Sequence, residues 1–139
     1  MILSGVEVKL AMIRHWTSFN GRPNWSYRDK VRVTLNFKSM LLLNRTAFEQ
    51  LGRPTAVELF FDRTYGIIGV KKTRPDAHNA FPVKAVPNSS HRKIYISSFC
   101  VNFDIKIDRT VVFFDAFVNP DGMLELSLAK ISRASRGAR

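Results

Sequence analysis

The sequence predicts a single, mainly β domain with short helices, in which two strand-helix-hairpin repeats close a small β-barrel. Three observations lead to this fold class. Apolar and polar residues alternate with period two in several short segments. The order strand, short helix, strand, strand occurs in both halves of the chain. With 139 residues, 45% of them hydrophobic, the chain is long enough for one compact core and too short for two ordinary ones.

We divide this single domain, residues 1–139, into five segments. They are an N-terminal strand and aromatic-basic loop (1–29), a first repeat (30–73), a connector (74–91), a second repeat (92–130) and a basic tail (131–139). In the first segment Val6, Val8, Leu10 and Met12 alternate with Glu7, Lys9 and Ala11, which predicts a strand with one buried face.

The first repeat opens with the clearest strand of the chain. Val31, Val33, Leu35 and Phe37 occupy one face of it, and Lys30, Arg32, Thr34, Asn36 and Lys38 occupy the other. Residues 40–43 continue the extended chain, and Asn44 then offers an N-cap oxygen to a short helix that runs to Leu51. Gly52 ends this helix in a left-handed conformation. Phe48 and Leu51 are expected to pack on the sheet.

A hairpin completes the first repeat. Residues 57–62 alternate in polarity, a turn follows around Tyr65 and Gly66, and residues 67–72 return. The connector is rich in Pro, Asn and Ser, which predicts a loop, with a short edge strand anchored by Phe81, Val83 and Val86.

The second repeat follows the same order. Ile94 and Ile96 define its first strand, and Ser97 or Ser98 caps a short helix that runs to Ile105. Residues 111–118 then form a strand that is apolar on both faces, residues 119–122 form a turn, and residues 124–128 alternate.

A polar-faced strand ends in Met40-Leu41-Leu42-Leu43-Asn44, a capped helix runs from Thr46 to Leu51 with Gly52, and strands 57–62 and 67–72 follow. This order resembles the AbrB/MazE/SpoVT swapped-hairpin DNA-binding domain. In that family two copies of strand-helix-hairpin build one barrel, usually by dimerisation. The resemblance implies a tandem arrangement of the MraZ kind, in which one chain closes its own AbrB-like barrel and binds DNA as a monomer or a homodimer.

The charge of the chain points to a polyanionic partner. There are 22 Lys+Arg against 11 Asp+Glu, a net charge of +11, and counterion release from phosphates favours such a surface. Two groups of cations are candidate nucleic-acid contacts. The first is Lys30, Arg32 and Lys38 with Arg45 at the helix start, and the second is Lys71, Lys72, Arg74, Arg92 and Lys93 on both sides of the connector. A solvated outer face would also explain the first group, and the members of the second converge or diverge depending on the fold.

Residues 14–28 interleave cations with four aromatic residues. Trp16, Phe19, Trp25 and Tyr27 suit base stacking, a protein partner, or packing on the core. The basic tail either binds a polyanion without specificity or is simply solvated.

The residue types argue against an enzyme. His15, His78 and His91 have no His or Cys at metal-ligand spacing, so we expect no metal and no cofactor. Asp104, Asp108 and Asp115 neighbour cations and are interpreted as ion-pair partners. Phosphate-loop, dinucleotide-binding and nucleophile-elbow motifs do not occur.

The expected compartment is the cytoplasm. Cys100 is the only cysteine and is interpreted as a core thiol in a reducing setting. Apolar residues near the N-terminus are interrupted by charges, and apolar runs are short, so we expect neither an export signal nor a membrane contact.

The leading functional hypothesis is a DNA-binding transcription regulator or antitoxin-like factor of bacterial or phage origin. One alternative is an RNA- or ribosome-associated basic protein, which the aromatic loop and the tail favour. The other is a structural or interaction module of a larger assembly, with residues 14–28 as the protein contact.

Overall fold

The computed structural model describes residue 17 and residues 30–133, so the strand expected over residues 6–12 lies outside the described part. The strands are β1 (Val33–Leu35), β2 (Met40–Leu43), β3 (Ala56–Asp62), β4 (Ile67–Thr73), β5 (Phe81–Pro82), β6 (Lys84–Ala85), β7 (Arg92–Tyr95), β8 (Val111–Phe113), β9 (Phe117–Val118), β10 (Met123–Ser127) and β11 (Ile131–Arg133). The helices are α1 (Arg45–Gln50) and α2 (Ser97–Asn102). The prediction of a mainly β fold with short helices is confirmed.

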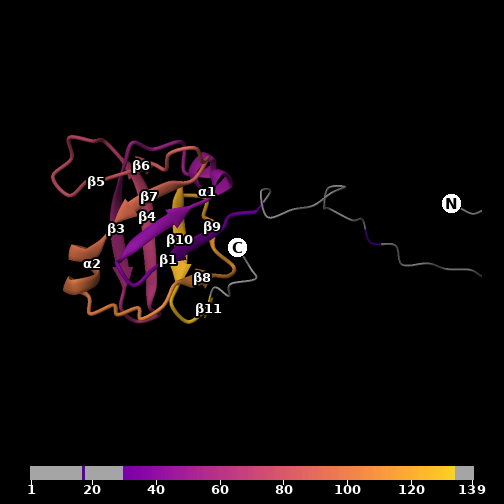
Figure 1. The fold of residues 1–139 in the computed structure, drawn as a ribbon, viewed down its shortest axis with the longest axis vertical. Coiled ribbons are helices and arrows are strands. Elements are labelled where there is room, and N and C mark those ends of the chain that lie inside the picture. Colours follow the sequence, from indigo (N-terminus) through magenta and orange to yellow (C-terminus); the bar gives the residue numbers. More distant parts are fainter. Residues whose placement is uncertain (1–16, 18–29, 134–139) are drawn as a thin grey trace, which may run out of the picture.

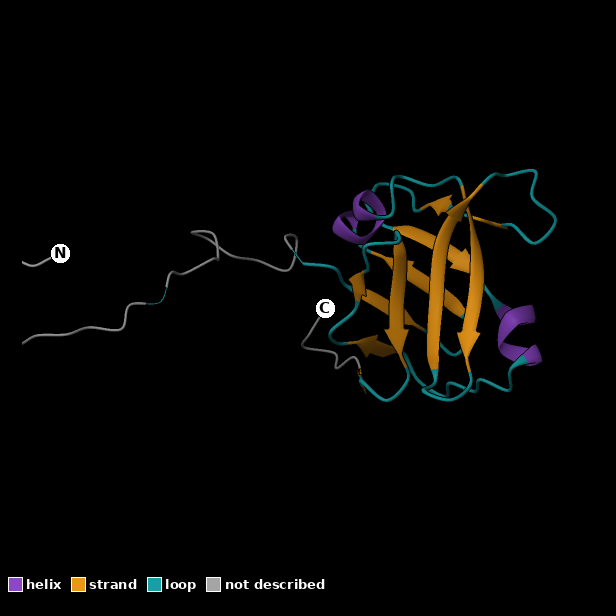
Figure 2. Cartoon of the chain, turned by 180° about the vertical axis from the view of Figure 1, so that it is seen from behind, coloured by secondary structure: helices purple, strands orange, loops and turns teal. Residues whose placement is uncertain are grey.

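The strands form two antiparallel sheets that enclose the core between them. One sheet has six strands in the order β11-β8-β1-β2-β7-β6, and the other has five in the order β5-β3-β4-β10-β9. Figure 1 looks onto the six-stranded sheet, and Figure 2 looks onto the five-stranded sheet from behind. The two helices lie at opposite ends of this sandwich rather than across either sheet (Figure 1). Both outer sheet faces are therefore left uncovered by the described helices.

The expected strand over residues 30–38 is shorter than predicted, and the chain does not continue extended into residue 40. It reverses through residues 36–39, and Val33 pairs with Leu43 in an antiparallel hairpin. The Asn36 side chain accepts hydrogen bonds from the backbone N–H groups of Lys38 and Met40, at 2.9 and 3.0 Å. Because the turn takes Phe37 out of the strand, this side chain is 63% exposed instead of buried.

Helix α1 begins and ends as the sequence predicts. The Asn44 side chain accepts a hydrogen bond from the Ala47 N–H at 2.9 Å, and Gly52 adopts a φ of +87°. The inward face of the helix buries Ala47 and Leu51, and the helix packs against β2 of one sheet and β9 of the other.

The hairpin of the first repeat and the edge strand of the connector are also confirmed. Strands β3 and β4 pair along their whole length, and the Asp62 carboxylate accepts hydrogen bonds from the N–H groups of Thr64 and Tyr65 in the turn between them. Within the connector, β5 pairs with β3 and β6 pairs with β7, so the connector contributes one edge strand to each sheet.

Two predictions for the second repeat are wrong. Helix α2 has Ile96 at its N-cap and no capping side chain, so neither Ser97 nor Ser98 performs that role, and the helix ends at Asn102. The single strand expected over residues 111–118 is divided into β8 and β9, which belong to different sheets. Asp115 has a φ of 60°, and this left-handed residue lies where the chain passes from one sheet to the other.

The closed barrel is not found in residues 30–133, where the strands form two separate sheets. Each sheet is nevertheless built about one antiparallel pair that joins the two halves of the chain. In the first sheet β2 pairs with β7, flanked by β1 and β6, and in the second β4 pairs with β10, flanked by β3 and β9. This strand order is symmetric apart from β5, β8 and β11, which extend the sheets.

The core consists of the inward residues of both sheets and the buried residues of both helices. Leu41 and Ile94 face each other at the centre of one sheet, Val70 and Leu124 at the centre of the other, and all four are 0% exposed. The ring of Phe61 lies 6.2 Å from that of Phe99 and 5.0 Å from that of Phe103, which ties the α2 region to β3. Among the described residues no helix has the length and apolar character needed to cross a membrane.

Candidate nucleic-acid interface

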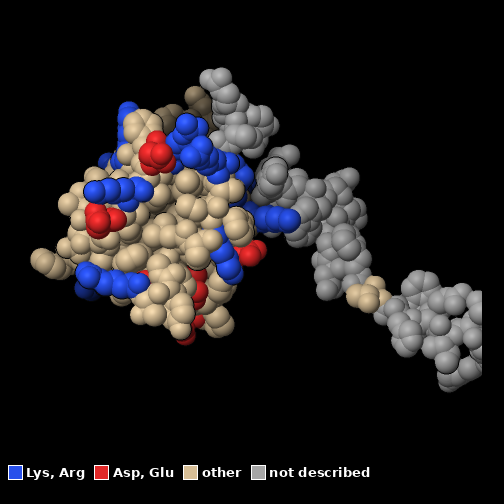
Figure 3. Space-filling view, turned by 90° about the horizontal axis from the view of Figure 1, so that it is seen from below, with Lys and Arg blue, Asp and Glu red and all other residues tan. Residues whose placement is uncertain are grey.

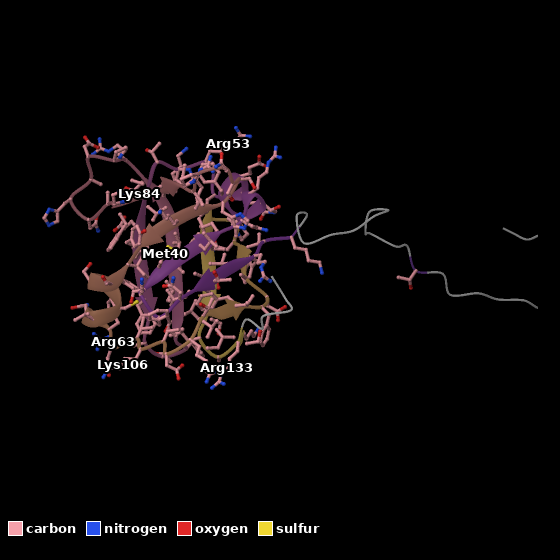
Figure 4. The ribbon with its side chains drawn as sticks, in the orientation of Figure 1. Met40, Arg53, Arg63, Lys84, Lys106 and Arg133 are labelled. Atoms are coloured by element: carbon pink, nitrogen blue, oxygen red, sulfur yellow. The ribbon has the colours of Figure 1, made fainter. Side chains whose placement is uncertain are left out.

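One row of outward-pointing residues crosses all six strands of the larger sheet. Strand pairing places Ser132, Val112, Thr34, Leu42, Lys93 and Lys84 side by side in that order. Their chain neighbours Val33, Leu43 and Ile94 are fully buried, so the row itself faces outward. A second cross-strand pair on the same side is Met40 with Tyr95. We call these eight residues the basic face. Figure 4 shows Met40 near its middle and Lys84 toward its β6 side.

The two sheets differ in charge. The six strands of the larger sheet contain no Asp or Glu, whereas they contain Lys84, Arg92, Lys93 and Arg133. Strands of the smaller sheet carry Glu58, Asp62 and Glu125 beside Lys71 and Lys72. The strands of the larger sheet therefore carry a net positive charge. The described carboxylates lie on the strands of the smaller sheet and in the loops and ends of the sandwich.

Lys84 and Lys93 are directly opposite each other on β6 and β7. Like charges at directly opposed positions of an antiparallel pair destabilise it. Neither lysine takes part in the ion pairs formed between described residues, which involve Arg45, Arg53, Arg74, Lys106 and Lys130. The Lys93 Nζ lies instead 5.6 Å from the centroid of the Tyr95 ring. The two opposed lysines of the basic face therefore repel each other and attract anions.

The first predicted group of cations is divided by the β1–β2 hairpin. The Asn44 side chain accepts a hydrogen bond from the Arg32 N–H at 3.1 Å and donates one to the Lys30 carbonyl at 2.6 Å. Lys30, Arg32 and Arg45 therefore start from the same end of the hairpin, next to α1, whereas Lys38 lies in the turn at the other end. The expectation that Lys30, Arg32 and Lys38 share one strand face is wrong, because β1 contains none of them.

The second predicted group diverges. Lys71 and Lys72 are neighbours on β4 and point to opposite sides of the sheet. Lys71 lies opposite Glu58 in the strand pairing, and Arg74 pairs with Asp76 at 3.5 Å. Lys93 is the member of this group that belongs to the basic face.

The other two members of that group contact the α1 region. Lys72 donates a hydrogen bond from Nζ to the Gly52 carbonyl at 3.1 Å, and the Arg92 guanidinium lies 4.4 Å from the centroid of the Phe48 ring. Arg45 and Arg53 both contact the Glu49 carboxylate, at 3.0 and 3.1 Å. The hydrogen bond from Arg45, with the charges of both arginines, lowers the pKa of Glu49. The cations of α1 are thus partly neutralised within the protein.

Cations elsewhere do not form one continuous patch. Figure 4 places Arg53 at one end of the sandwich and Arg63, Lys106 and Arg133 at the other. Seen from below in Figure 3, that second end carries Lys and Arg side chains, some of them side by side, with Asp and Glu among them. The aromatic candidates Trp16, Phe19, Trp25 and Tyr27 lie outside the described residues.

Sequence reasoning missed Lys84, Tyr95 and Phe37. Lys84 stands in a connector whose composition predicts a loop, and its position opposite Lys93 depends on a two-residue strand. The outward position of Tyr95 could have been predicted, because Lys93 and Tyr95 alternate with Ile94 and Ile96, which are buried.

The outer face of the smaller sheet has a different chemistry. A shallow hollow of about 290 Å³ is lined there by Tyr65, Ile67, Phe117 and the ion pair between Lys130 and Asp115, which spans 3.9 Å. Among the described residues no group of three or more His, Cys, Asp or Glu is placed to hold a metal ion. Cys100 is a buried free thiol, and its burial raises its pKa.

Comparisons with known proteins identify no relative, so a functional conclusion depends on the chemistry of these surfaces. No protein-family model matches the chain, and neither the search of curated proteins nor that of solved structures found a match.

Proposed function

We propose that the protein binds nucleic acid through the outer face of its six-stranded sheet. The observation that carries the proposal is the opposed pair Lys84 and Lys93 on a sheet whose strands contain no carboxylate. The two like charges face each other here, and neither lysine forms an ion pair with another described residue. Phosphate groups would neutralise both lysines, and the net charge of +11 would attract a polyanion from a distance.

The composition of the face agrees with such a ligand. The other residues of the face are uncharged and add no carboxylate that would repel a phosphate: Ser132, Val112, Thr34, Leu42, Met40 and Tyr95. A buried free thiol at Cys100 is compatible with the reducing cytoplasm, where nucleic acid is present. No catalytic role is proposed.

The test is a pair of charge-matched double variants. K84Q/K93Q removes the opposed lysines, and K71Q/K106Q removes two exposed lysines elsewhere. We expect the first to weaken binding of a labelled oligonucleotide about tenfold and to reduce the log-log salt slope by about 0.7 to 0.9 per lysine. Fluorescence anisotropy across a salt series measures both quantities. Equal losses in the two variants would remove the basic face from the proposal.

A second candidate is the duplex-DNA regulator or antitoxin-like factor implied by the AbrB resemblance. It is favoured by the order β2-α1-β3-β4, to which β1 is an added strand, and by the pairing of the two halves about β2·β7 and β4·β10. In this candidate Arg45 and Arg53 of the α1 region are the contacts. R45Q/R53Q would then weaken duplex binding more than K84Q/K93Q does, a ranking opposite to that of the leading proposal.

A further inference from the structure

Two exposed aromatic rings lie at the same end of the six-stranded sheet. Tyr95 ends β7, pairs with Met40 at the start of β2, and is 49% exposed. Phe37 is 63% exposed in the turn that leads into Met40. The Ser39 carbonyl in that turn accepts a hydrogen bond from the Ile96 N–H at 2.9 Å, which holds the turn beside the end of β7.

Each of these rings has a lysine next to it. The Lys93 Nζ lies 5.6 Å from the centroid of Tyr95, and the Lys38 Nζ lies 5.8 Å from the centroid of Phe37. Neither lysine takes part in an ion pair between described residues. An exposed ring beside a cation provides a surface on which a base can stack while the neighbouring phosphate is neutralised.

We infer that the ligand is a single-stranded nucleic acid whose bases stack on Tyr95 and Phe37, an inference that rests on the proposed function. Lys93, Lys38 and Lys84 contact its phosphates. Single strands present unpaired bases with free aromatic faces, and sheet surfaces with exposed aromatic residues bind them in this way. The opposed lysines attract any polyanion, whereas the two rings select for unstacked bases.

A duplex does not fit this surface equally well. Its bases are stacked inside the helix, and its major groove admits a protruding α-helix or a two-stranded ribbon. The described helices do not cross the basic face, and each has six residues. Their inward sides are occupied by the core through Ala47 in α1 and through Phe99 and Cys100 in α2. The basic face and the adjoining Phe37 turn therefore offer rings and lysines beside a sheet rather than a helix that enters a groove.

The experiment measures binding of the full chain to three labelled probes of equal length: oligo-dT, oligo-rU and a DNA duplex. We expect Y95L and F37L each to weaken single-strand binding about 5- to 140-fold, the range of one stacked base. The salt slope should stay unchanged because no charge is removed. Y65L is the matched control, since Tyr65 is 71% exposed in the β3–β4 turn of the other sheet. The ratio of the oligo-dT and oligo-rU affinities distinguishes single-stranded DNA from RNA.

The outcomes separate this inference from the proposed function. If Y95L and F37L bind single strands as the unmodified protein does while K84Q/K93Q binds weakly, stacking is overturned and the basic face stands. If K84Q/K93Q also binds normally, both proposals fall. Tighter binding of the duplex than of either single strand would overturn the inference as well. Thermal unfolding of each variant checks that the exposed substitutions leave the fold intact.

Discussion

Asn44 is the residue on which most local structure depends. Its side chain caps α1 through the Ala47 N–H and also fixes the preceding strand through the Arg32 N–H and the Lys30 carbonyl. It is 8% exposed, the most buried polar residue among those described. The capping role could be predicted from Asn44 and the apolar spacing behind it. The bonds to residues 30 and 32 could not, because they require the hairpin that brings these residues back to the helix.

Replacing Asn44 should therefore cost more than loss of an ordinary cap. We expect N44A to lower the free energy of unfolding by about 2 to 3 kcal/mol, about 1 for the cap and about 1 for each further buried hydrogen bond. N44D retains the acceptor and should lose about 1 kcal/mol. Urea denaturation measures both variants, with N102A at the exposed end of α2 as control. Equal stabilities of N44A and N102A would contradict the assignment.

Cys100 illustrates a residue whose chemistry is suppressed by its position. It is 3% exposed, and burial raises its pKa, an effect that a hydrogen bond with Ser39 opposes only in part. Because the thiolate is the reactive form, iodoacetamide should label Cys100 far more slowly in the folded protein than in urea. Mass spectrometry after timed quenching gives the two rates. Similar rates would mean that the α2 region opens readily.

The same shift predicts a pH dependence. Because the pKa of Cys100 is higher in the folded protein than in the unfolded chain, the folded protein holds the thiol proton more tightly. This contribution to stability is fully present below the unfolded pKa of about 8.5, and it is lost as the pH rises from there through the folded pKa. C100S should flatten the decline between neutral and alkaline pH in urea titrations. An unchanged decline in C100S would assign it to other groups.

At the scale of elements, period-two alternation located strands well but not their ends. The turn at residues 36–39 depends on one Asn36 side chain inside an apparently continuous alternation. The division of residues 111–118 into β8 and β9 depends on Asp115 in a left-handed conformation. Both breaks occur at residues that tolerate turns, yet neither is marked by Gly or Pro. The hydrophobic alternation continues across each break, and for this reason the sequence predicted uninterrupted strands there.

Close packing of β4 against β10 gives an element-scale prediction. A Cβ added at Gly69 would lie 2.5 Å from the Met123 Sδ, so the methionine covers the glycine on the outer face. We expect G69A to lower the free energy of unfolding by no more than about 1 kcal/mol, because the flexible Met123 side chain can move aside. In an M123A background the same change should be neutral or stabilising by about 0.5 kcal/mol, because alanine suits a strand better than glycine. A double-mutant cycle by urea denaturation gives the coupling, and its absence would contradict this packing.

At the scale of the whole molecule, charge is distributed between two sheets in a way that composition cannot reveal. The excess of cations is evident from sequence, and a polyanionic partner could be proposed from it. The opposition of Lys84 to Lys93 depends on the short pairing of β6, in the connector, with β7. The Phe37 turn lies beside Tyr95 only because β2 and β7, which are far apart in the chain, pair in one sheet. The predicted patches failed to converge for the same reason, since strand faces and hairpin ends separated their members.

This distribution sets stability against the proposed nucleic-acid binding on the basic face. K84E converts a like-charge pair into an attractive one and should raise the free energy of unfolding by about 0.5 to 1 kcal/mol at low salt. The gain should shrink at high salt because the charges are screened. Oligonucleotide affinity should fall in the same variant. K106E is the control, because Lys106 lies 3.5 Å from Asp104 and its replacement creates a repulsion. A destabilised K84E would contradict the proposed repulsion.

The central pairs β2·β7 and β4·β10 both join residues before the exposed loop 87–90 to residues after it. The hydrogen bonds of these two strand pairs therefore hold the halves together independently of the covalent link at that loop. Two polypeptides divided there, each insoluble or unstructured when expressed separately, should assemble when co-expressed into a nicked equivalent of the intact domain. Such a pair would serve as a complementation reporter, its signal arising only in cells that make both pieces.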